Sequence, residues 1–256
     1  MKTSWKEDSV AGKFDAYNDV LEQTLGFEYV FRKFDKADIK KVLDFGCGPG
    51  KVAYRLADRI DCNVIAVDES SKMLDIAKKK RKHSHVDYHL IEHDNLSFLP
   101  GHSVDAAMAC YVFINTDSDQ RIKRIMGEIF RVLKPGASFV ILDTNPDSTG
   151  IEFSTFRNGI PGKEYSYGEE RNEWLHVPEQ EDLILNDFHW PKSMYYKLLS
   201  NVGFESVTLL EPTLNDIDGE QLKAIEQKFK FNNWKSEKEY PPFIIFEAVK
   251  PTLGGV

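Results

Sequence analysis

Short apolar runs alternate with amphipathic segments between residues 41 and 142, and this rhythm constrains the fold more than any other feature. The apolar runs have the length of strands, and between them apolar residues recur at the spacing of a helix that packs on a sheet. Runs lie at residues 41–45, 64–67, 86–91, 104–111 and 138–142, with helical segments at 51–59, 70–77 and 120–133. Strands that alternate with helices form βαβ units, which build a parallel sheet. We therefore predict an α/β, Rossmann-like fold with a mainly parallel sheet.

The chain beyond residue 142 departs from this alternation. Residues 143–184 are polar, contain Gly and Pro, and show no sustained period, so the sequence predicts no regular element there. The elements expected further on are a half-buried strand at 185–190, a helix at 192–201 and two strands at 207–210 and 243–249. A long connection rather than a crossover helix joins the last two strands, which indicates an antiparallel arrangement. We expect a seven-stranded sheet with an antiparallel C-terminal edge strand.

The sequence shows no repeat, low-complexity tract or linker that would separate independent units. We predict a single domain over residues 1–256, made of four parts. These are an N-terminal helical lid (1–38), a cofactor-binding core (39–143), a cap over the substrate region (144–190) and the C-terminal part of the sheet (191–256). The N-terminal part is amphipathic and aromatic. It can pack across the edge of the domain, cover a ligand, or contact a second subunit in a homo-oligomer.

Charge and hydropathy exclude several classes of function. The chain carries 33 Lys and Arg against 41 Asp and Glu, a net charge of −8. Proteins that bind nucleic acid neutralise phosphates with basic residues, so we expect no nucleic-acid partner. No run approaches the roughly 18 apolar residues of a membrane-spanning helix, and the acidic N-terminus lacks the apolar core of a signal peptide. We expect a cytoplasmic protein without a membrane partner.

Neither the cysteines nor the histidines suggest a metal site. Cys47, Cys62 and Cys110 are widely separated and form no CxxC pair, which argues against zinc and against a disulfide framework. His85 and His93 lie at the two ends of a segment that reads as an extended strand. At about 3.3 Å per residue they would lie roughly 26 Å apart, too far to share an ion. We expect reduced cysteines and no bound metal.

A glycine-rich loop follows the first predicted strand and opens the first helix: Asp44-Phe-Gly-Cys-Gly-Pro-Gly50. Glycine lets the backbone turn sharply and lets a ligand approach closely, and open α/β sheets bind ligands at the carboxyl ends of their strands. The dinucleotide fingerprint GxGxxG would require glycine at position 51. That position holds Lys51, and the third glycine is Gly50. The loop therefore predicts a ligand site and departs from the dinucleotide pattern.

The second predicted strand ends in Asp68 and Glu69. A carboxylate at this place can accept hydrogen bonds from both hydroxyls of a ribose. Nicotinamide-cofactor proteins use an acidic residue at the same position, so Asp68 indicates a nucleoside without naming it. Asp68 or Ser70 can also serve as the N-cap of the following helix, a role that is compatible with ribose binding.

The GxGxG spacing, with Asp44 two residues before the first glycine, resembles motif I of the class I S-adenosylmethionine-dependent methyltransferases. The resemblance extends from Lys41 to Asp143, and it implies S-adenosylmethionine as cofactor and S-adenosylhomocysteine as product. Asp44 suits a cationic ammonium group. Asp94, supported by Asn95, occupies the place of the adenine contact or forms an Asx turn. The cofactor-binding residues implied are Tyr17, Asp44, Gly46, Cys47, Gly48, Asp68, Glu69, Met73, Asp94, Asn95 and Cys110.

Motifs of other methyltransferase classes narrow the substrate. The Asn/Asp-Pro-Pro-Tyr/Phe motif of enzymes that methylate DNA bases or protein glutamine is missing after the fourth strand, where residues 110–113 read Cys-Tyr-Val-Phe. The Pro-Cys nucleophile of cytosine-C5 enzymes is missing as well. Both observations favour a small-molecule methyl acceptor. The tail over residues 187–212 is similar, in short stretches, to the toxoflavin-type N-methyltransferases, which modify a fused heterocycle.

We predict an S-adenosylmethionine-dependent methyltransferase that acts on a small molecule, a heterocycle or another secondary metabolite, at N, O or C. Tyr17 and Tyr111 are candidate catalytic residues because their rings can face the sulfonium in a cation–π contact. His189 is a third candidate because it can orient or deprotonate the acceptor. Two alternatives stay open: a catalytically silent nucleoside-binding protein of the same fold, and an NAD-dependent oxidoreductase.

Overall fold

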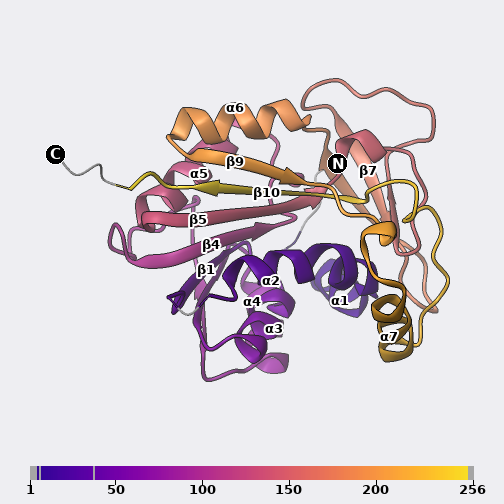
Figure 1. Cartoon of the computed structure of the whole chain (residues 1–256), viewed down its shortest axis with the longest axis horizontal. Coiled ribbons are helices and arrows are strands. Elements are labelled where there is room, and N and C mark those ends of the chain that lie inside the picture. The colour runs from indigo at the N-terminus through magenta and orange to yellow at the C-terminus, as the bar shows by residue number, and fades with distance from the viewer. Residues whose placement is uncertain (1–4, 6, 37, 253–256) are drawn as a thin grey trace.

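The computed structural model describes residues 5, 7–36 and 38–252 of the chain. A seven-stranded sheet crosses the molecule, with its strands in the order β3-β2-β1-β4-β5-β10-β9 (Figure 1). The strands are β1 (Lys41–Phe45), β2 (Asn63–Asp68), β3 (Val86–Leu90), β4 (Val104–Cys110), β5 (Leu133–Thr144), β9 (Glu205–Leu210) and β10 (Phe243–Val249). The five strands from β3 to β5 are mutually parallel. The predicted α/β fold with a mainly parallel sheet is confirmed.

The predicted antiparallel C-terminal strand is β10. It pairs antiparallel with β5 on one side and with β9 on the other. Strand β10 therefore lies one place in from the edge, and β9 is the outermost strand. The connection over residues 211–242 is long enough to bring the chain back between two strands that precede it.

Alternate residues of each strand point to opposite faces of the sheet and fill two separate hydrophobic cores. Val42 of β1 and Leu142 of β5 pack on the face covered by α3, α4 and the N-terminal helices. Their neighbours Leu43 and Ile141 pack on the opposite face, against α5 and α6. The helices on the sheet are α3 (Lys51–Arg59), α4 (Ser71–Lys80), α5 (Asp119–Val132) and α6 (Lys192–Val202). Both faces are thus covered, as expected for a parallel sheet.

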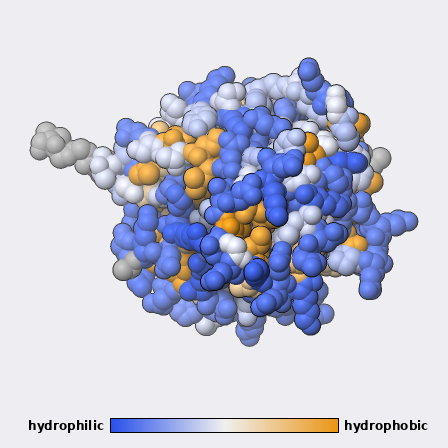
Figure 2. Space-filling view, turned by 45° about the vertical axis from the view of Figure 1, so that its right-hand side comes forward, coloured by the Kyte–Doolittle hydropathy of each residue, from blue (hydrophilic) through white to orange (hydrophobic). Residues whose placement is uncertain are grey.

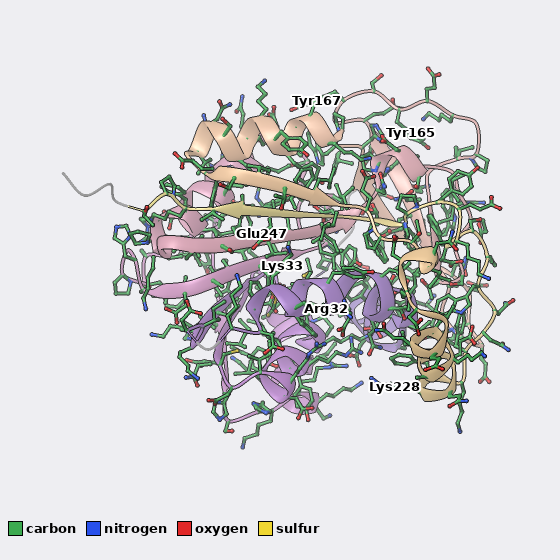
Figure 3. The ribbon with its side chains drawn as sticks, in the orientation of Figure 1. Arg32, Lys33, Tyr165, Tyr167, Lys228 and Glu247 are labelled. Carbon is green, nitrogen blue, oxygen red and sulfur yellow. The ribbon has the colours of Figure 1, made fainter. Side chains whose placement is uncertain are left out.

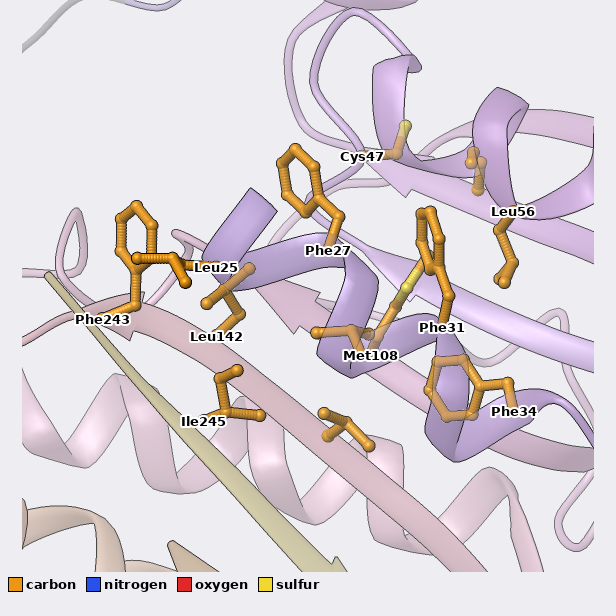
Figure 4. Packing of buried hydrophobic residues seen from close by; sticks show 14 of the residues in the cluster. Leu25, Phe27, Phe31, Phe34, Cys47, Leu56, Met108, Leu142, Phe243 and Ile245 are labelled. Atoms are coloured by element: carbon orange, nitrogen blue, oxygen red, sulfur yellow. The ribbon is translucent and has the colours of Figure 1, made fainter. Parts of the chain in front are cut away.

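Three helices form what we call the N-terminal segment: α1 (Asp8–Ala16), the π-helix η1 (Glu22–Phe27) and α2 (Glu28–Phe34). Its phenylalanines are buried against residues of β4, β5 and β10 (Figure 4), namely Phe27, Phe31 and Phe34 against Met108, Leu142 and Ile245. An ion pair of 2.7 Å joins Lys33 of α2 to Glu247 of β10 (Figure 3). The N-terminal segment is therefore helical and packs on the sheet of its own chain.

A second, three-stranded antiparallel sheet lies beside the carboxyl ends of the parallel strands (Figure 1). Its strands are β6 (Phe156–Asn158), the central β7 (Glu170–Leu175) and β8 (Leu183–Phe188). The prediction of no regular element over residues 143–184 is wrong. The inward positions of β7 include Arg171 and Glu173, and buried charges conceal the apolar alternation of a strand. Helix α7 (Gly219–Phe229), which has no buried residue, also lies outside the predicted elements.

One face of the molecule is mostly hydrophilic (Figure 2), and within the described chain the three cysteines form no disulfide. Hydrophilic residues cover most of the face in Figure 2, and hydrophobic areas lie between them. None of the described helices is long and apolar enough to cross a membrane. Cys47, Cys62 and Cys110 are free cysteines. Within residues 5, 7–36 and 38–252, no group of three or more His, Cys, Asp or Glu side chains is placed to hold a metal ion.

Candidate cofactor and acceptor site

The glycine-rich loop joins β1 to α3 at the carboxyl edge of the sheet. Gly46, Gly48 and Gly50 have φ values of 74°, 53° and 79°, a left-handed conformation that glycine adopts without a steric penalty. The N–H groups of Gly46 and Cys47 donate to the Val67 carbonyl at 2.8 and 2.9 Å. The loop is thus fixed to the end of β2, and the ends of two adjacent strands form one wall.

Asp44 lies in β1 and is 1% exposed. Its Oδ2 atom is buried and has no hydrogen-bond partner among the described residues. Burial, together with repulsion from Asp68, raises the pKa of Asp44 to about 7. A buried carboxyl without a partner is unfavourable, so this position favours a ligand that brings a cation or a hydrogen-bond donor.

The Asp68 carboxylate connects the glycine loop to the loop after β2. Its Oδ2 accepts the N–H of Gly48 at 2.8 Å, and its Oδ1 accepts the N–H of Ser70 at 2.7 Å. The N-cap of α4 is Ser70, whose hydroxyl oxygen accepts the N–H of Met73. Burial raises the pKa of Asp68 above its ordinary value. Asp68 therefore organises the loop at the cavity wall, and Ser70 caps the helix.

Arg121 of α5 joins two of the predicted residues. Its Nε and Nη2 donate to both carboxyl oxygens of Asp94 at distances from 2.6 to 3.2 Å. The same Nη2 lies 2.8 Å from Glu69 Oε2. Arg121 is not among the residues predicted for the site, because a charge on an amphipathic helix ordinarily indicates the solvated face. These three side chains form a charged wall beside the end of β2.

Asp44, Asp68 and Arg121, with the loop residues Gly46 and Gly48, line one cavity of about 490 Å³, a volume in the range of small-molecule sites. The cavity lies between the carboxyl ends of the parallel strands, the N-terminal segment and strands β7 and β8. The predicted residues on its wall are Tyr17, Asp44, Gly46, Cys47, Gly48, Asp68, Glu69, Met73, Asp94, Cys110 and Tyr111. The structure therefore brings together nearly all the residues that the sequence singled out.

Two predicted residues, Asn95 and His189, do not line this cavity. Asn95 is exposed, and its Oδ1 accepts the N–H of Ser97 at 2.7 Å, which is the Asx-turn alternative. His189 Nδ1 lies 3.4 Å from Nη1 of Arg171. The strand predicted over residues 185–190 ends at Phe188, so His189 lies just beyond it.

A buried polar group occupies part of the cavity wall; we call it the carboxyl chamber and define it as Tyr17, Glu22, Tyr111 and Glu173. Tyr17 Oη donates to Glu22 Oε1 at 2.5 Å. Glu22 Oε2 and Tyr111 Oη are buried without hydrogen-bond partners in the part of the chain that the structure describes. Burial raises the pKa of Glu22 to about 8, and burial with repulsion from Asp187 raises that of Glu173 well above its ordinary value. Both tyrosines are among the residues predicted for the site, and neither glutamate is.

The π-helix η1 explains how an acidic side chain comes to be buried here. Such widened helical turns are frequent at functional sites. The helix approaches the sheet closely at Gly26, where a Cβ atom would lie 3.0 Å from Leu142 Cδ2 and 3.2 Å from Tyr111 Oη. This approach places Glu22 on the cavity wall. An acidic residue in an amphipathic segment ordinarily predicts a solvated position, so no sequence signal identified Glu22.

Trp5 and the N-terminal segment are hydrogen-bonded to residues beside the loops of the cavity. Ser70 Oγ donates to the Trp5 carbonyl at 2.7 Å. Lys51 Nζ donates to the carbonyls of Phe14 and Tyr17 at 3.3 and 3.1 Å. These bonds connect the chain around α1 to both helices that follow β1 and β2.

Comparisons with known proteins agree with this geometry. Residues 42–136 match the family model described as a methyltransferase domain. N-demethylindolmycin N-methyltransferase of Streptomyces griseus is 34% identical, over 82% of this chain and 90% of that protein. Demethylmenaquinone methyltransferase of Thermotoga maritima is 32% identical, over 71% of this chain and 73% of its own length.

Solved structures show the same fold at lower identity. A putative S-adenosylmethionine-dependent methyltransferase of Listeria monocytogenes superposes with a TM-score of 0.57 at 19% identity, covering 88% of this chain and 98% of the other. Phosphoethanolamine N-methyltransferase 2 of Haemonchus contortus, crystallised with S-adenosylmethionine, gives a TM-score of 0.58 at 16% identity, covering 98% and 60%. These relatives are methyltransferases, which leaves the NAD-dependent alternative without support. The chain belongs to the class I S-adenosylmethionine-dependent methyltransferases.

Proposed function

We propose that this enzyme transfers the methyl group of S-adenosylmethionine to a nitrogen atom of a small molecule that binds in the carboxyl chamber. The observation that carries the proposal is the 34% identity to N-demethylindolmycin N-methyltransferase, of which 90% is covered. That relative is named for N-methylation of a small molecule. The short resemblance of residues 187–212 to toxoflavin-type N-methyltransferases supports the same class of acceptor. Nitrogen also suits the chamber, because N–H groups donate to carboxyl oxygens.

The cavity wall fits the cofactor. Bound S-adenosylmethionine supplies a methyl group on a positively charged sulfur atom. We assign its ammonium group to Asp44, because Oδ2 of this carboxyl has no partner among the described residues. We assign its ribose to Asp68 and its adenine to Asp94. The rings of Tyr17 and Tyr111 are then the aromatic groups that face the sulfonium.

The chain contributes to the reaction by orienting the acceptor and by excluding water from it. Holding a nucleophile in line with the bond that breaks can account for roughly 7–11 kcal/mol of a barrier. The polar atoms of the carboxyl chamber include the buried Glu22 Oε2 and Tyr111 Oη. An acceptor bound there is shielded from water and oriented by fixed side chains.

Arg121→Ala is expected to weaken the binding of S-adenosylhomocysteine about tenfold, or about 1.4 kcal/mol. The reason is that Asp94, 6% exposed, loses the arginine that holds both of its oxygens, so its carboxylate no longer keeps a fixed place at the adenine. Isothermal titration calorimetry measures the change. Arg124→Ala is the control, because Arg124 is exposed on the same helix. An unchanged affinity in the Arg121 variant would contradict the placement of adenine at Asp94.

The proposed reaction is tested by incubating the purified enzyme with methyl-labelled S-adenosylmethionine and a panel of amino-heterocycles, phenols and quinols. We expect label to appear on nitrogen, located by mass spectrometry and NMR of the product. Methylation of oxygen or carbon alone would replace the nitrogen assignment. Micromolar binding of S-adenosylhomocysteine without transfer to any member of the panel would favour a catalytically silent binding protein.

A further inference from the structure

Glu22 is a buried carboxyl of the chamber with one unsatisfied oxygen. It is 5% exposed and lines the cavity. Tyr17 donates to its Oε1, while its Oε2 has no hydrogen-bond partner within residues 5, 7–36 and 38–252. A carboxylate oxygen accepts hydrogen bonds and cannot donate them. The free position at Oε2 is therefore suited to a donor supplied by a ligand.

The charged and titratable groups around Glu22 come from several elements. Asp19 and Lys51 act on it electrostatically, along with its partner Tyr17. Burial is the largest cause that raises the pKa of Tyr111, and repulsion from Glu22 adds to it. The pKa of Glu173 is raised by burial first, then by repulsion from Asp187, and Glu22 raises it further. The groups facing Glu22 thus include two further carboxyls and two phenols, with Lys51 as the cation that acts on it.

The nearby cations are directed away from the Glu22 carboxyl. Lys51 Nζ donates to two backbone carbonyls and lies 3.9 Å from Asp19. Arg55 pairs with Asp19 at 2.6 Å. Arg171, on the side of Glu173, donates to the hydroxyls of Thr144 and Thr149. Among the described residues, Arg171 acts electrostatically on Glu173, and no cation forms a hydrogen bond or an ion pair with Glu22, so a ligand is suited to supply one.

We propose that Glu22 binds the methyl acceptor through a basic nitrogen that carries N–H groups, and that it takes the proton which this nitrogen loses before methylation. The inference rests on the proposed function and specifies its substrate class, an amine or amidine rather than a neutral oxygen nucleophile. Glu173 is the second carboxyl that the acceptor meets. Glu22 is then a catalytic residue supplied by the N-terminal segment.

The proton and electron balance of this step is simple. The protonated acceptor enters as R–NH3⁺ and gives one proton to the Glu22 carboxylate, leaving R–NH2 with a free lone pair. That lone pair forms the new N–C bond while the C–S bond breaks and its electron pair returns to sulfur, which becomes a neutral thioether. The product leaves as a methylated ammonium ion. Glu22 keeps this proton as a neutral carboxyl in the ligand-free chamber, and it gives one proton to solvent when the next protonated acceptor binds.

Binding of a cation at Glu22 should be linked to proton release. The pKa of Glu22 is about 8 in the ligand-free chamber, mainly because of burial. The carboxyl is therefore mostly protonated at pH 7 and has to ionise when it pairs with an ammonium or amidinium group. Affinity for a basic ligand rises between about pH 6 and 8 and is level above that range until the ligand itself loses its proton.

The test uses the full chain saturated with S-adenosylhomocysteine and a set of paired fragments. Benzylamine is paired with benzyl alcohol, and 2-aminobenzimidazole with benzimidazol-2-one, so each basic nitrogen compound has a neutral partner of similar shape. We expect the basic member to bind about tenfold or more tightly, the value of a hydrogen bond to a charged group. Calorimetry at pH 7 in buffers of different ionisation enthalpy should show protons released on binding.

Glu22→Gln is expected to remove both the preference and the proton release, because the amide keeps the acceptor for Tyr17 but cannot ionise. Glu173→Gln is the second variant, used if the first fails to fold, and it should reduce the preference. Glu247→Gln is the control, since Glu247 pairs with Lys33 outside the cavity. Equal binding of basic and neutral partners, or proton release that survives in Glu22→Gln, would overturn the proposal. If the wild type does not bind S-adenosylhomocysteine, the proposed function itself is overturned.

Discussion

The Asp44→Asn variant is expected to bind S-adenosylhomocysteine about 100-fold more weakly than the wild type, a loss of about 2.7 kcal/mol. Asparagine keeps the shape of the side chain but removes the negative charge opposite the ammonium group of the ligand. Breaking a buried pair of charges by neutralising one partner costs several kcal/mol. Calorimetry gives the affinity directly, and an affinity within threefold of the wild type would show that the ammonium group lies elsewhere.

The same substitution should stabilise the ligand-free protein at pH 8. The pKa of Asp44 is about 7, against an ordinary value of 3.8. A carboxyl whose pKa is raised by folding contributes stability that is complete below its ordinary pKa and is lost as the pH rises through the raised value. Asparagine does not ionise, so the melting temperature of the variant should exceed that of the wild type by a margin that grows between about pH 4 and 7 and is level above pH 7.

Asp105→Asn provides a control with the opposite sign. Asp105 is partly buried, yet its pKa lies below the ordinary value, because Lys134 and the N–H groups of Lys40 and Lys41 stabilise the ionised form. Its stabilising contribution is present above the ordinary pKa, so this variant should melt lower than the wild type at pH 8. If both variants shifted in the same direction, the unfavourable charge at Asp44 would not be the cause.

Gly46→Ala is expected to destabilise the protein by about 2–4 kcal/mol, the sum of a left-handed backbone and an overpacked contact. Gly46 has φ 74°, and a Cβ atom there would lie 2.5 Å from Val112 Cγ2. Moving the loop to relieve this contact would also disturb the wall where the cofactor binds. Urea denaturation and calorimetry with S-adenosylhomocysteine measure the two effects.

Gly127→Ala is the matched control for the glycine loop. Gly127 lies in α5, and a Cβ atom there meets nothing within 4 Å. Alanine is favoured over glycine in a helix by about 1 kcal/mol, so this variant should be slightly more stable and bind the ligand normally. A comparable loss of stability in both variants would mean that the loop geometry is not what constrains position 46.

The parallel sheet was accessible from the sequence because its inward residues are apolar and its turns are marked by glycine. Val42 and Leu43 point to opposite cores, so a continuous apolar run indicated a strand buried on both faces. Asp44 and Asp68 could be assigned to the ligand site because they lie at the ends of predicted strands. For these residues, position in the chain and position in the site are linked by one rule of α/β sheets.

The acceptor end of the cavity was not accessible in the same way. Arg171 and Glu173 occupy inward positions of β7, where sequence rules expect apolar residues. Glu22 depends on a π-helix, and Arg121 depends on a carboxylate 27 residues away in the chain. Tertiary contacts decide whether these charges are buried, and the local pattern of apolar and polar residues does not predict such contacts.

The attachment of the residues around α1 to the cavity loops has a kinetic consequence. We expect exchange of the cofactor to break the contacts of Trp5 with Ser70 and of Lys51 with Phe14, because these contacts join the chain around α1 to the loops of the cavity. The same stretch of chain leads directly into η1, which carries Glu22, so a molecule that is open for exchange has an incomplete acceptor pocket. Steady-state kinetics should therefore follow a compulsory order, in which S-adenosylmethionine binds before the acceptor and S-adenosylhomocysteine dissociates last.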